Sequence, residues 1–220
     1  MNNSIVRNGL ILTAFAIVTT AIIALTYSGT KATIEQQLVN KRLAILNAIV
    51  PANLFDNDMQ HRCTKATNAS LLGSNEAHNV YLGELAGMPS VLAIEATAPN
   101  GYSGKIELIV GMQIDGTVTG VRVLNHKETP GLGDKIDLRV SDWILSFDQE
   151  TVHQDNLQNW QVKKDGGQFD QFTGATITPR AVVKAVKNAV IFAKQNHAEL
   201  YASSVNCENT APLPSPEEDV

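Results

Sequence analysis

The chain has 220 residues, which is enough for one or two domains with a buried core. Its composition, 44% hydrophobic and 18% charged, is that of an ordinary globular protein. The formal net charge is -5, and no dense stripe of Lys and Arg is present, so the positive surface that neutralises nucleic-acid phosphates is missing. These features argue against a nucleic-acid-binding protein.

The N-terminus departs from this ordinary composition. From Gly9 to Tyr27 the sequence reads "GLILTAFAIVTTAIIALTY" and carries no charge. As a helix rising ~1.5 Å per residue it spans about 28 Å, close to the hydrocarbon thickness of a bilayer. A cleaved signal peptide is the alternative, but no small-x-small cleavage pattern follows Ala24. We therefore predict an uncleaved membrane anchor over residues 1–28, whose orientation the flanking Lys and Arg residues leave open.

Residues 29–78 are expected to connect the anchor to a folded domain. Apolar side chains keep a helical period as far as Pro51, which predicts a helix that leaves the membrane and holds the domain away from it. Residues 52–78 are polar and irregular, and we expect a loop with short helical pieces. The apolar positions of the predicted helix are Ile34, Leu38, Ile45 and Ile49.

From Asn79 onward the pattern is that of β-strands. Four runs rich in Val and Ile are separated by Gly, Pro or Asp-Gly, at 80–85, 90–98, 105–114 and 118–126. Asp115-Gly116 predicts a tight hairpin turn between the last two runs, because Gly readily adopts positive φ. A mainly antiparallel sheet is the expected result.

The remainder of the chain adds helical segments. We expect a helix over 134–147 and a second hairpin around Asp165-Gly166-Gly167. A final helix is predicted to be capped by Thr178, to carry Pro179 in its first turn and to reach about Gln195. Its expected core face is formed by Val182, Val183, Val186 and Val190. Trp143 and Trp160, which precede this helix, are also expected in the core.

These elements predict an α+β fold with a single N-terminal transmembrane helix. One folded domain is expected over 79–202, with a mainly antiparallel sheet and flanking helices. The acidic tail over 203–220 is expected to be disordered. The chain has two cysteines, Cys63 and Cys207, without metal-ligand spacing. Independent thiols and a single disulfide both remain open. No metal site is expected.

The most informative segment precedes the final helix. Thr173, Gly174, Ala175 and Thr176 stand where a strand is expected to give way to a helix. A helix N-terminus offers free N–H groups and a partial positive charge, which suit a phosphate. The plain alternative is a turn followed by an ordinary helix cap, and local pattern alone favours that alternative.

Two longer motifs are more specific than the local pattern of single residues. The stretch from Asp170 to Thr176, "DQFTGAT", resembles the D-x-x-[S/T]-G-A-[S/T] signature of the FMN-binding domain family, and residues 101–136 resemble the family's other signature, including "HKETPGLG" from His126 to Gly133. With the N-terminal anchor, the resemblance covers nearly the whole chain. It is strongest to the G-subunit family of Rnf-type ion-translocating electron-transport complexes, followed by the C subunits of the sodium-pumping NADH:quinone reductase.

The resemblance implies a covalent flavin. In such proteins the last hydroxyl residue of the signature, Thr176 here, carries FMN through a phosphoester made by a dedicated flavin transferase from FAD. Taken by pattern alone, His126 and Glu128 are surface or loop-ordering residues. The resemblance instead makes them part of the flavin pocket, and the full expected set is Thr176, Thr173, Gly174, Ala175, His126, Glu128, Thr129, Gly131 and Tyr102. None is expected to be a catalytic acid or base.

The function implied by the resemblance is electron carriage inside a membrane complex. Such a complex couples electron flow between ferredoxin and NAD to the movement of Na⁺ or H⁺. Its other membrane subunits and the flavin transferase are the expected partners. The expected location is a bacterial inner membrane, crossed once, with the FMN domain on the periplasmic side. A membrane-anchored sensory or scaffolding module that binds flavin without redox turnover is the alternative.

Overall fold

The computed structural model describes residues 2–203 and divides into two compact units, Met1–Leu43 and Ala44–Val220. The second unit contains the folded domain. Cys207 and the predicted acidic tail, from residue 204 onward, lie outside the described residues.

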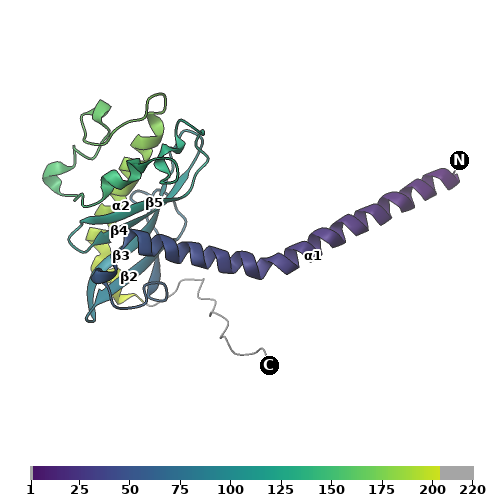
Figure 1. Ribbon diagram of the computed structural model, residues 1–220, viewed down its shortest axis with the longest axis horizontal. Helices are drawn as coiled ribbons and strands as arrows, with labels where there is room; N and C mark the ends of the chain where they lie inside the picture. Colours follow the sequence, from purple (N-terminus) through teal and green to yellow (C-terminus); the bar gives the residue numbers. More distant parts are fainter. Residues whose placement is uncertain (1, 204–220) are drawn as a thin grey trace. The chain divides into compact units, whose positions relative to one another are not determined.

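Helix α1 is one continuous α-helix of 48 residues, Asn2–Ile49 (Figure 1). Its segment Ser4–Ile34 is long and apolar enough to cross a membrane. Several threonine hydroxyls in this segment, such as those of Thr13 and Thr26, donate to the carbonyl four residues earlier, so these hydroxyls have partners within the helix. The prediction that the anchor continues as a helix almost to Pro51 is confirmed.

The folded unit is built on a five-stranded antiparallel sheet in the order β1-β2-β3-β4-β5 (Figure 1). All four sequence runs predicted as strands are strands in the structure. Strand β1 lies in the segment we expected to be irregular, because four residues among polar neighbours give too short a pattern to recognise. The strands are β1 (Cys63–Ala66), β2 (His78–Leu85), β3 (Met88–Ala98), β4 (Ile106–Gln113) and β5 (Val118–Asn125).

The predicted turn between β4 and β5 is confirmed. Gly116 adopts a φ of +96°, and the N–H of Gln113 donates to the carbonyl of Thr117 at 2.8 Å to close the hairpin. Cys63 on β1 is fully buried and disulfide-bonded.

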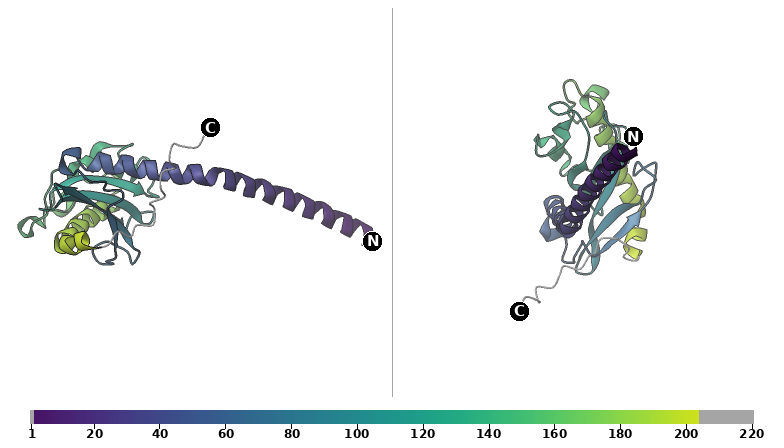
Figure 2. Two further views of the ribbon diagram at one scale, coloured as in Figure 1. Left: turned by 90° about the horizontal axis from the view of Figure 1, so that it is seen from below. Right: turned by 90° about the vertical axis from the view of Figure 1, so that its right-hand side faces the viewer.

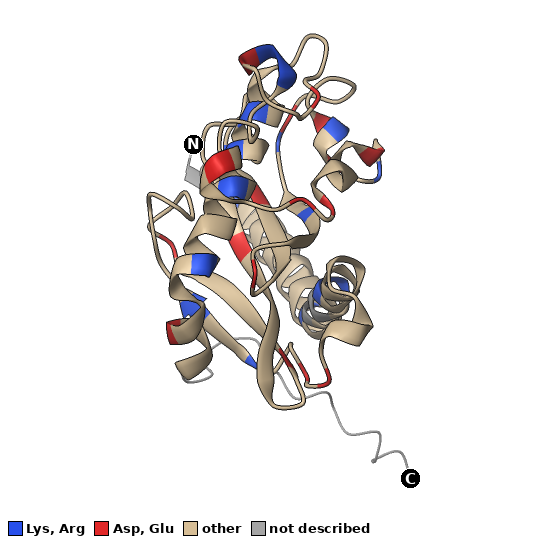
Figure 3. Ribbon diagram, turned by 90° about the vertical axis from the view of Figure 1, so that its left-hand side faces the viewer, with Lys and Arg blue, Asp and Glu red and all other residues tan. Residues whose placement is uncertain are grey.

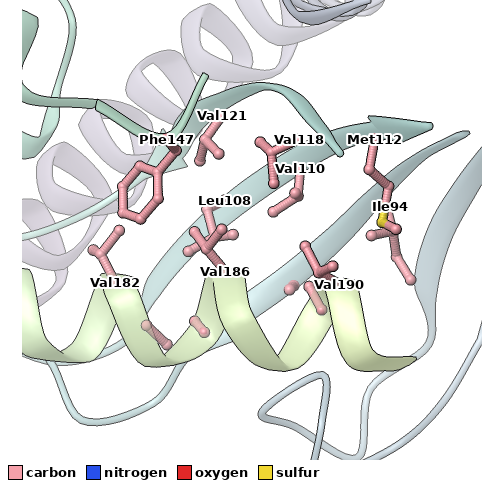
Figure 4. Packing of buried hydrophobic residues seen from close by; sticks show 14 of the residues in the cluster. Ile94, Leu108, Val110, Met112, Val118, Val121, Phe147, Val182, Val186 and Val190 are labelled. Atoms are coloured by element: carbon pink, nitrogen blue, oxygen red, sulfur yellow. The ribbon is translucent and has the colours of Figure 1, made fainter. Parts of the chain in front are cut away.

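Helix α2 (Ile177–Ala202) packs against β3 and β4 and covers one face of the sheet (Figure 2). Val182, Val186 and Val190 recur at helical spacing and point at the sheet, where they meet side chains such as Leu108 and Val110 (Figure 4). The four valines predicted as the core face of this helix are all buried, which confirms that face.

The opposite face of the sheet receives the last turn of α1. Leu46 and Ile49 form a second buried cluster with Val91, Ala93 and Ile109. Of the four residues predicted on one side of this helix, Ile45 and Ile49 pack against the sheet, whereas Ile34 is exposed. The side chain of Leu38 lies outside the described part of the chain. The sheet thus has helices on both faces.

The predicted helix over 134–147 is wrong. The structure has two short 3₁₀ helices there, η2 (Asp134–Ile136) and η3 (Asp142–Phe147). Side chains compete for the backbone between them: Asp137 accepts from the N–H of Arg139, and the hydroxyl of Ser141 accepts from the N–H of Trp143. Such local bonds favour turns over a continuous helix.

The second predicted hairpin is also wrong. Val162 and Phe169 form only an isolated parallel bridge, and the chain between them makes the 3₁₀ helix η5 (Lys163–Asp165); a further one, η4 (Gln154–Asn156), precedes it. Aromatic packing holds this segment, since Phe147 stacks on both Trp160 and Phe169. Trp160 is buried in the core as predicted, and Trp143 is partly buried against it.

Candidate functional site

A pocket of about 260 Å³ opens where α2 begins. Three chain segments meet there: the turn after β3, the loop after β5 and the first residues of α2. Its lining residues are Tyr102, Glu128, Thr129, Leu132, Gly133, Gly174, Ala175, Thr176, Ile177 and Thr178.

Thr176 is the N-cap residue of α2. The cap therefore lies two residues before the predicted cap, Thr178, and the helix ends at Ala202, beyond the predicted end near Gln195. The hydroxyl of Thr176 makes no capping hydrogen bond, and the N–H groups of Thr176, Ile177 and Thr178 donate to no acceptor among the described residues. Free N–H groups and the helix dipole make this end an anion-binding position.

Gly174 sets the approach to this helix start. It adopts a φ of +85°, a left-handed conformation that glycine enters without a Cβ clash. The reversal is closed by the N–H of Ala175, which donates to the carbonyl of Phe172 at 3.1 Å. Small residues therefore leave the Thr176 hydroxyl accessible from the pocket.

Glu128 is a buried carboxylate in the wall of the pocket, with a relative exposure of 4%. Its Oε1 accepts from the N–H of Ser103 at 2.9 Å, and its Oε2 accepts from the hydroxyl of Thr178. One side chain thus joins the turn after β3, the loop after β5 and the start of α2. Sequence pattern alone suggested a surface or loop-ordering role for Glu128; the surface assignment is wrong, because the side chain is enclosed by these three segments.

Gly133 gives the carboxylate its space. A Cβ atom at Gly133 would lie 2.9 Å from both the Oε2 of Glu128 and the Oγ1 of Thr178. The glycine therefore permits the contact between these two side chains.

His126 stands behind the pocket wall. Its Nδ1 accepts from the N–H of Glu128 at 3.2 Å, and its Nε2 lies 3.8 Å from the Oδ2 of Asp137. Hydrogen bonding from Arg139 is the main cause that lowers the pKa of Asp137. His126 thus orients the backbone that carries Glu128.

The mouth of the pocket is apolar. Tyr102, Leu132 and Ile177 line it with relative exposures of 67%, 43% and 48%. Large exposed apolar side chains gathered at one opening are typical of a ligand or partner site. Basic and acidic residues are interspersed over the domain (Figure 3), and Arg180, in the first turn of α2, pairs with Asp165.

The structure brings most of the predicted site residues together. Tyr102, Glu128, Thr129, Gly174, Ala175 and Thr176 line the pocket, whereas His126, Gly131 and Thr173 do not. Gly131, with a φ of +76°, and Thr173 are both exposed at the surrounding turns.

Sequence reasoning missed Ser103, Leu132, Ile177 and the role of Thr178. Thr178 was assigned to helix capping, although its hydroxyl is fully buried and donates to Glu128. The contact spans 50 residues of chain, so no local signal identifies it.

Comparison with known proteins is consistent with this geometry. The model of the FMN-binding domain matches residues 101–191, which include every lining residue of the pocket, and the model of the RnfG N-terminal region matches residues 1–49.

Full-length relatives agree. The G subunit of the ion-translocating oxidoreductase complex of Pseudoalteromonas atlantica is 56% identical over 95% of this chain and 97% of its own length. The protein of the same name from Vibrio atlanticus is 54% identical over 94% of this chain and 99% of its own. One from Vibrio cholerae is 51% identical over 94% and 99%. The chain therefore belongs to the family of G subunits of ion-translocating oxidoreductase complexes.

Proposed function

We propose that this protein is the FMN-carrying electron-transfer subunit of an ion-translocating oxidoreductase complex, with FMN esterified to Thr176. One observation carries the proposal. The hydroxyl of Thr176, which makes no capping hydrogen bond, stands at the N-cap of α2 and in the wall of a pocket, within the segment that matches the FMN-binding domain.

The residues present fit such a group. A phosphodiester keeps a single negative charge, which suits the free N–H groups and dipole at the start of α2. Gly174 and Ala175 leave room for it, and the apolar mouth offers Tyr102, Leu132 and Ile177 to an aromatic ring. Bound FMN would supply hydride or single-electron chemistry, while the protein holds and orients it.

Attachment uses Thr176 as the acceptor in a group transfer from FAD catalysed by a flavin transferase. The Oγ1 of Thr176 forms a bond to the phosphorus of the FMN half as the pyrophosphate bond breaks. AMP leaves, and the hydroxyl proton is released. Of the neighbouring threonines, Thr178 has its hydroxyl buried against Glu128, and Thr173 lies outside the pocket lining.

Within the complex, α1 anchors the protein by a single span of the bacterial inner membrane. We place the FMN domain on the periplasmic side, an assignment supported by the disulfide at Cys63, because disulfides persist in oxidising compartments. Other subunits hold iron–sulfur clusters and move Na⁺ or H⁺, and electrons pass between ferredoxin and NAD.

The test is the intact mass of the full-length protein, expressed in membranes together with the flavin transferase and followed by peptide mapping. The expected result is a gain of one FMN phosphoester on the peptide that contains Thr176. Thr176→Ala should lose the flavin and the turnover of the complex while assembly is kept, and Thr176→Ser should retain both.

An unmodified mass, obtained with a transferase active on another substrate, would overturn the proposal. The unsubstituted protein could carry covalent flavin while the complex containing Thr176→Ala keeps its full turnover. That result would instead favour a sensory or scaffolding module.

A further inference from the structure

Glu128 is an unusual wall residue for a pocket that takes a phosphate. It is 4% exposed, and no Lys, Arg or His nitrogen among the described residues forms an ion pair with it. Burial of a carboxylate without a cationic partner costs free energy, which its hydrogen bonds must offset.

Each oxygen of the Glu128 carboxylate accepts one hydrogen bond. One oxygen accepts from a backbone N–H, that of Ser103, and the other accepts from a hydroxyl, that of Thr178. Both bonds are thus donated to the carboxylate, whose oxygens act as acceptors. Thr178 lies in the first turn of α2, where the partial positive charge of the helix also favours an anion.

We infer that Glu128 is an electrostatic positioning residue whose fixed negative charge in the pocket wall lowers the reduction potential of the bound flavin. The inference rests on the proposed function, because it requires FMN in this pocket. Reduction of a flavin adds electron density to its ring, and a neighbouring buried negative charge opposes that addition. Water screens the charge weakly at a position so little exposed.

The chain offers a substitution that removes the charge with little other change. In Glu128→Gln, the amide oxygen can still accept from the N–H of Ser103, and the amide NH₂ can donate to Thr178, whose hydroxyl can accept instead. Glu95→Gln is the matched control. Glu95 is also a hydrogen-bonded carboxylate, held by Asn79 and Tyr81 on the sheet, and it does not line the pocket.

The experiment is a potentiometric titration, with dithionite as the electron source, of full-length protein purified in detergent after coexpression with the transferase. Glu128→Gln should raise the midpoint potential, with on the order of a tenfold higher ratio of reduced to oxidised flavin at a fixed solution potential. Glu95→Gln should leave the potential unchanged. Thr178→Val keeps the carboxylate and removes only a neutral donor, so its potential should stay at or below that of the unsubstituted protein.

An unchanged potential in a fully loaded Glu128→Gln protein overturns the inference. So does an equal rise in Thr178→Val, since general disturbance of the pocket would then be the cause. Loss of flavin loading in Glu128→Gln also overturns it, because Glu128 would then serve attachment. Absence of covalent flavin from the unsubstituted protein is a different result, which defeats the proposed function itself.

Discussion

Ile49, in the last turn of α1, lies directly against Gly120 on β5: a Cβ atom added to this glycine would be 2.9 Å from the Cα of Ile49. Gly111 pairs with Gly120 across β4 and β5. A Cβ atom added to Gly111 would likewise lie 2.9 Å from the carbonyl oxygen of Ile49. Two facing glycines thus make a hollow in the sheet into which the helix end fits.

Gly120→Ala should therefore push the last turn of α1 off the sheet. The expected loss is about 1–3 kcal/mol in the free energy of unfolding, from overpacking in a buried layer. Urea unfolding of the full-length protein in detergent, followed by tryptophan fluorescence, measures it. Gly29→Ala is the control, since nothing lies within 4 Å of that position and alanine favours a helix. Equal stability of both variants would contradict the packing described.

A methyl group at Gly133 tests the junction at the pocket. Gly133 has a φ of -86°, so alanine meets no backbone strain there, but its Cβ would crowd the oxygens of Glu128 and Thr178. We expect Gly133→Ala to cost about 1–3 kcal/mol and to reduce flavin loading measured by intact mass. Lys127→Ala, an exposed change in the same loop, should do neither. Normal loading in Gly133→Ala would show that the contact between Glu128 and Thr178 is dispensable for the pocket.

Tyr201 ties the end of α2 to the bulge in β2. Its hydroxyl donates toward the carbonyls of Gly83 at 2.8 Å and Val91 at 2.7 Å, where the register of the strand pair shifts. Tyr201→Phe should cost about 1 kcal/mol at neutral pH, the typical net value of a hydrogen bond.

The same residue predicts a dependence on alkaline pH. Burial raises the pKa of Tyr201 well above its ordinary value of 10.0. The folded state therefore keeps a proton that the unfolded state releases, and the stability from this group is complete below pH 10 and falls as the pH rises above it. Urea titrations across this range should show a steeper fall for the unsubstituted protein than for Tyr201→Phe. Parallel curves would contradict the assignment.

Acid stability should depend on Arg139. Hydrogen bonding from Arg139 lowers the pKa of Asp137 below its ordinary value of 3.8. Asp137 therefore contributes stability above that value, and the contribution is lost as the pH falls through the lower pKa of the folded state. In Arg139→Gln the midpoint of acid unfolding, followed by tryptophan fluorescence, should move to higher pH. Lys127→Gln removes a positive charge from an exposed position and should leave the midpoint in place.

The local sequence predicted the regular elements well where each has its own signal. Strands β2 to β5 carry runs of Val and Ile bounded by turn residues, and α2 repeats its valines at helical spacing. The segment after β5 lacks such a local sequence signal. Phe147, Trp160 and Phe169 pack against one another there, and these contacts hold 3₁₀ turns where periodicity indicated a helix and a hairpin.

The sequence by itself determined the apolar span of α1, strands β2 to β5 and the threonine motif at the start of α2, because each depends on neighbours a few residues apart. Only the tertiary structure decided that Glu128 is buried against Thr178, and that Gly120 receives Ile49. Those contacts join residues that are 50 or more positions apart, and their free energy arises from packing and desolvation once the sheet and helices have assembled.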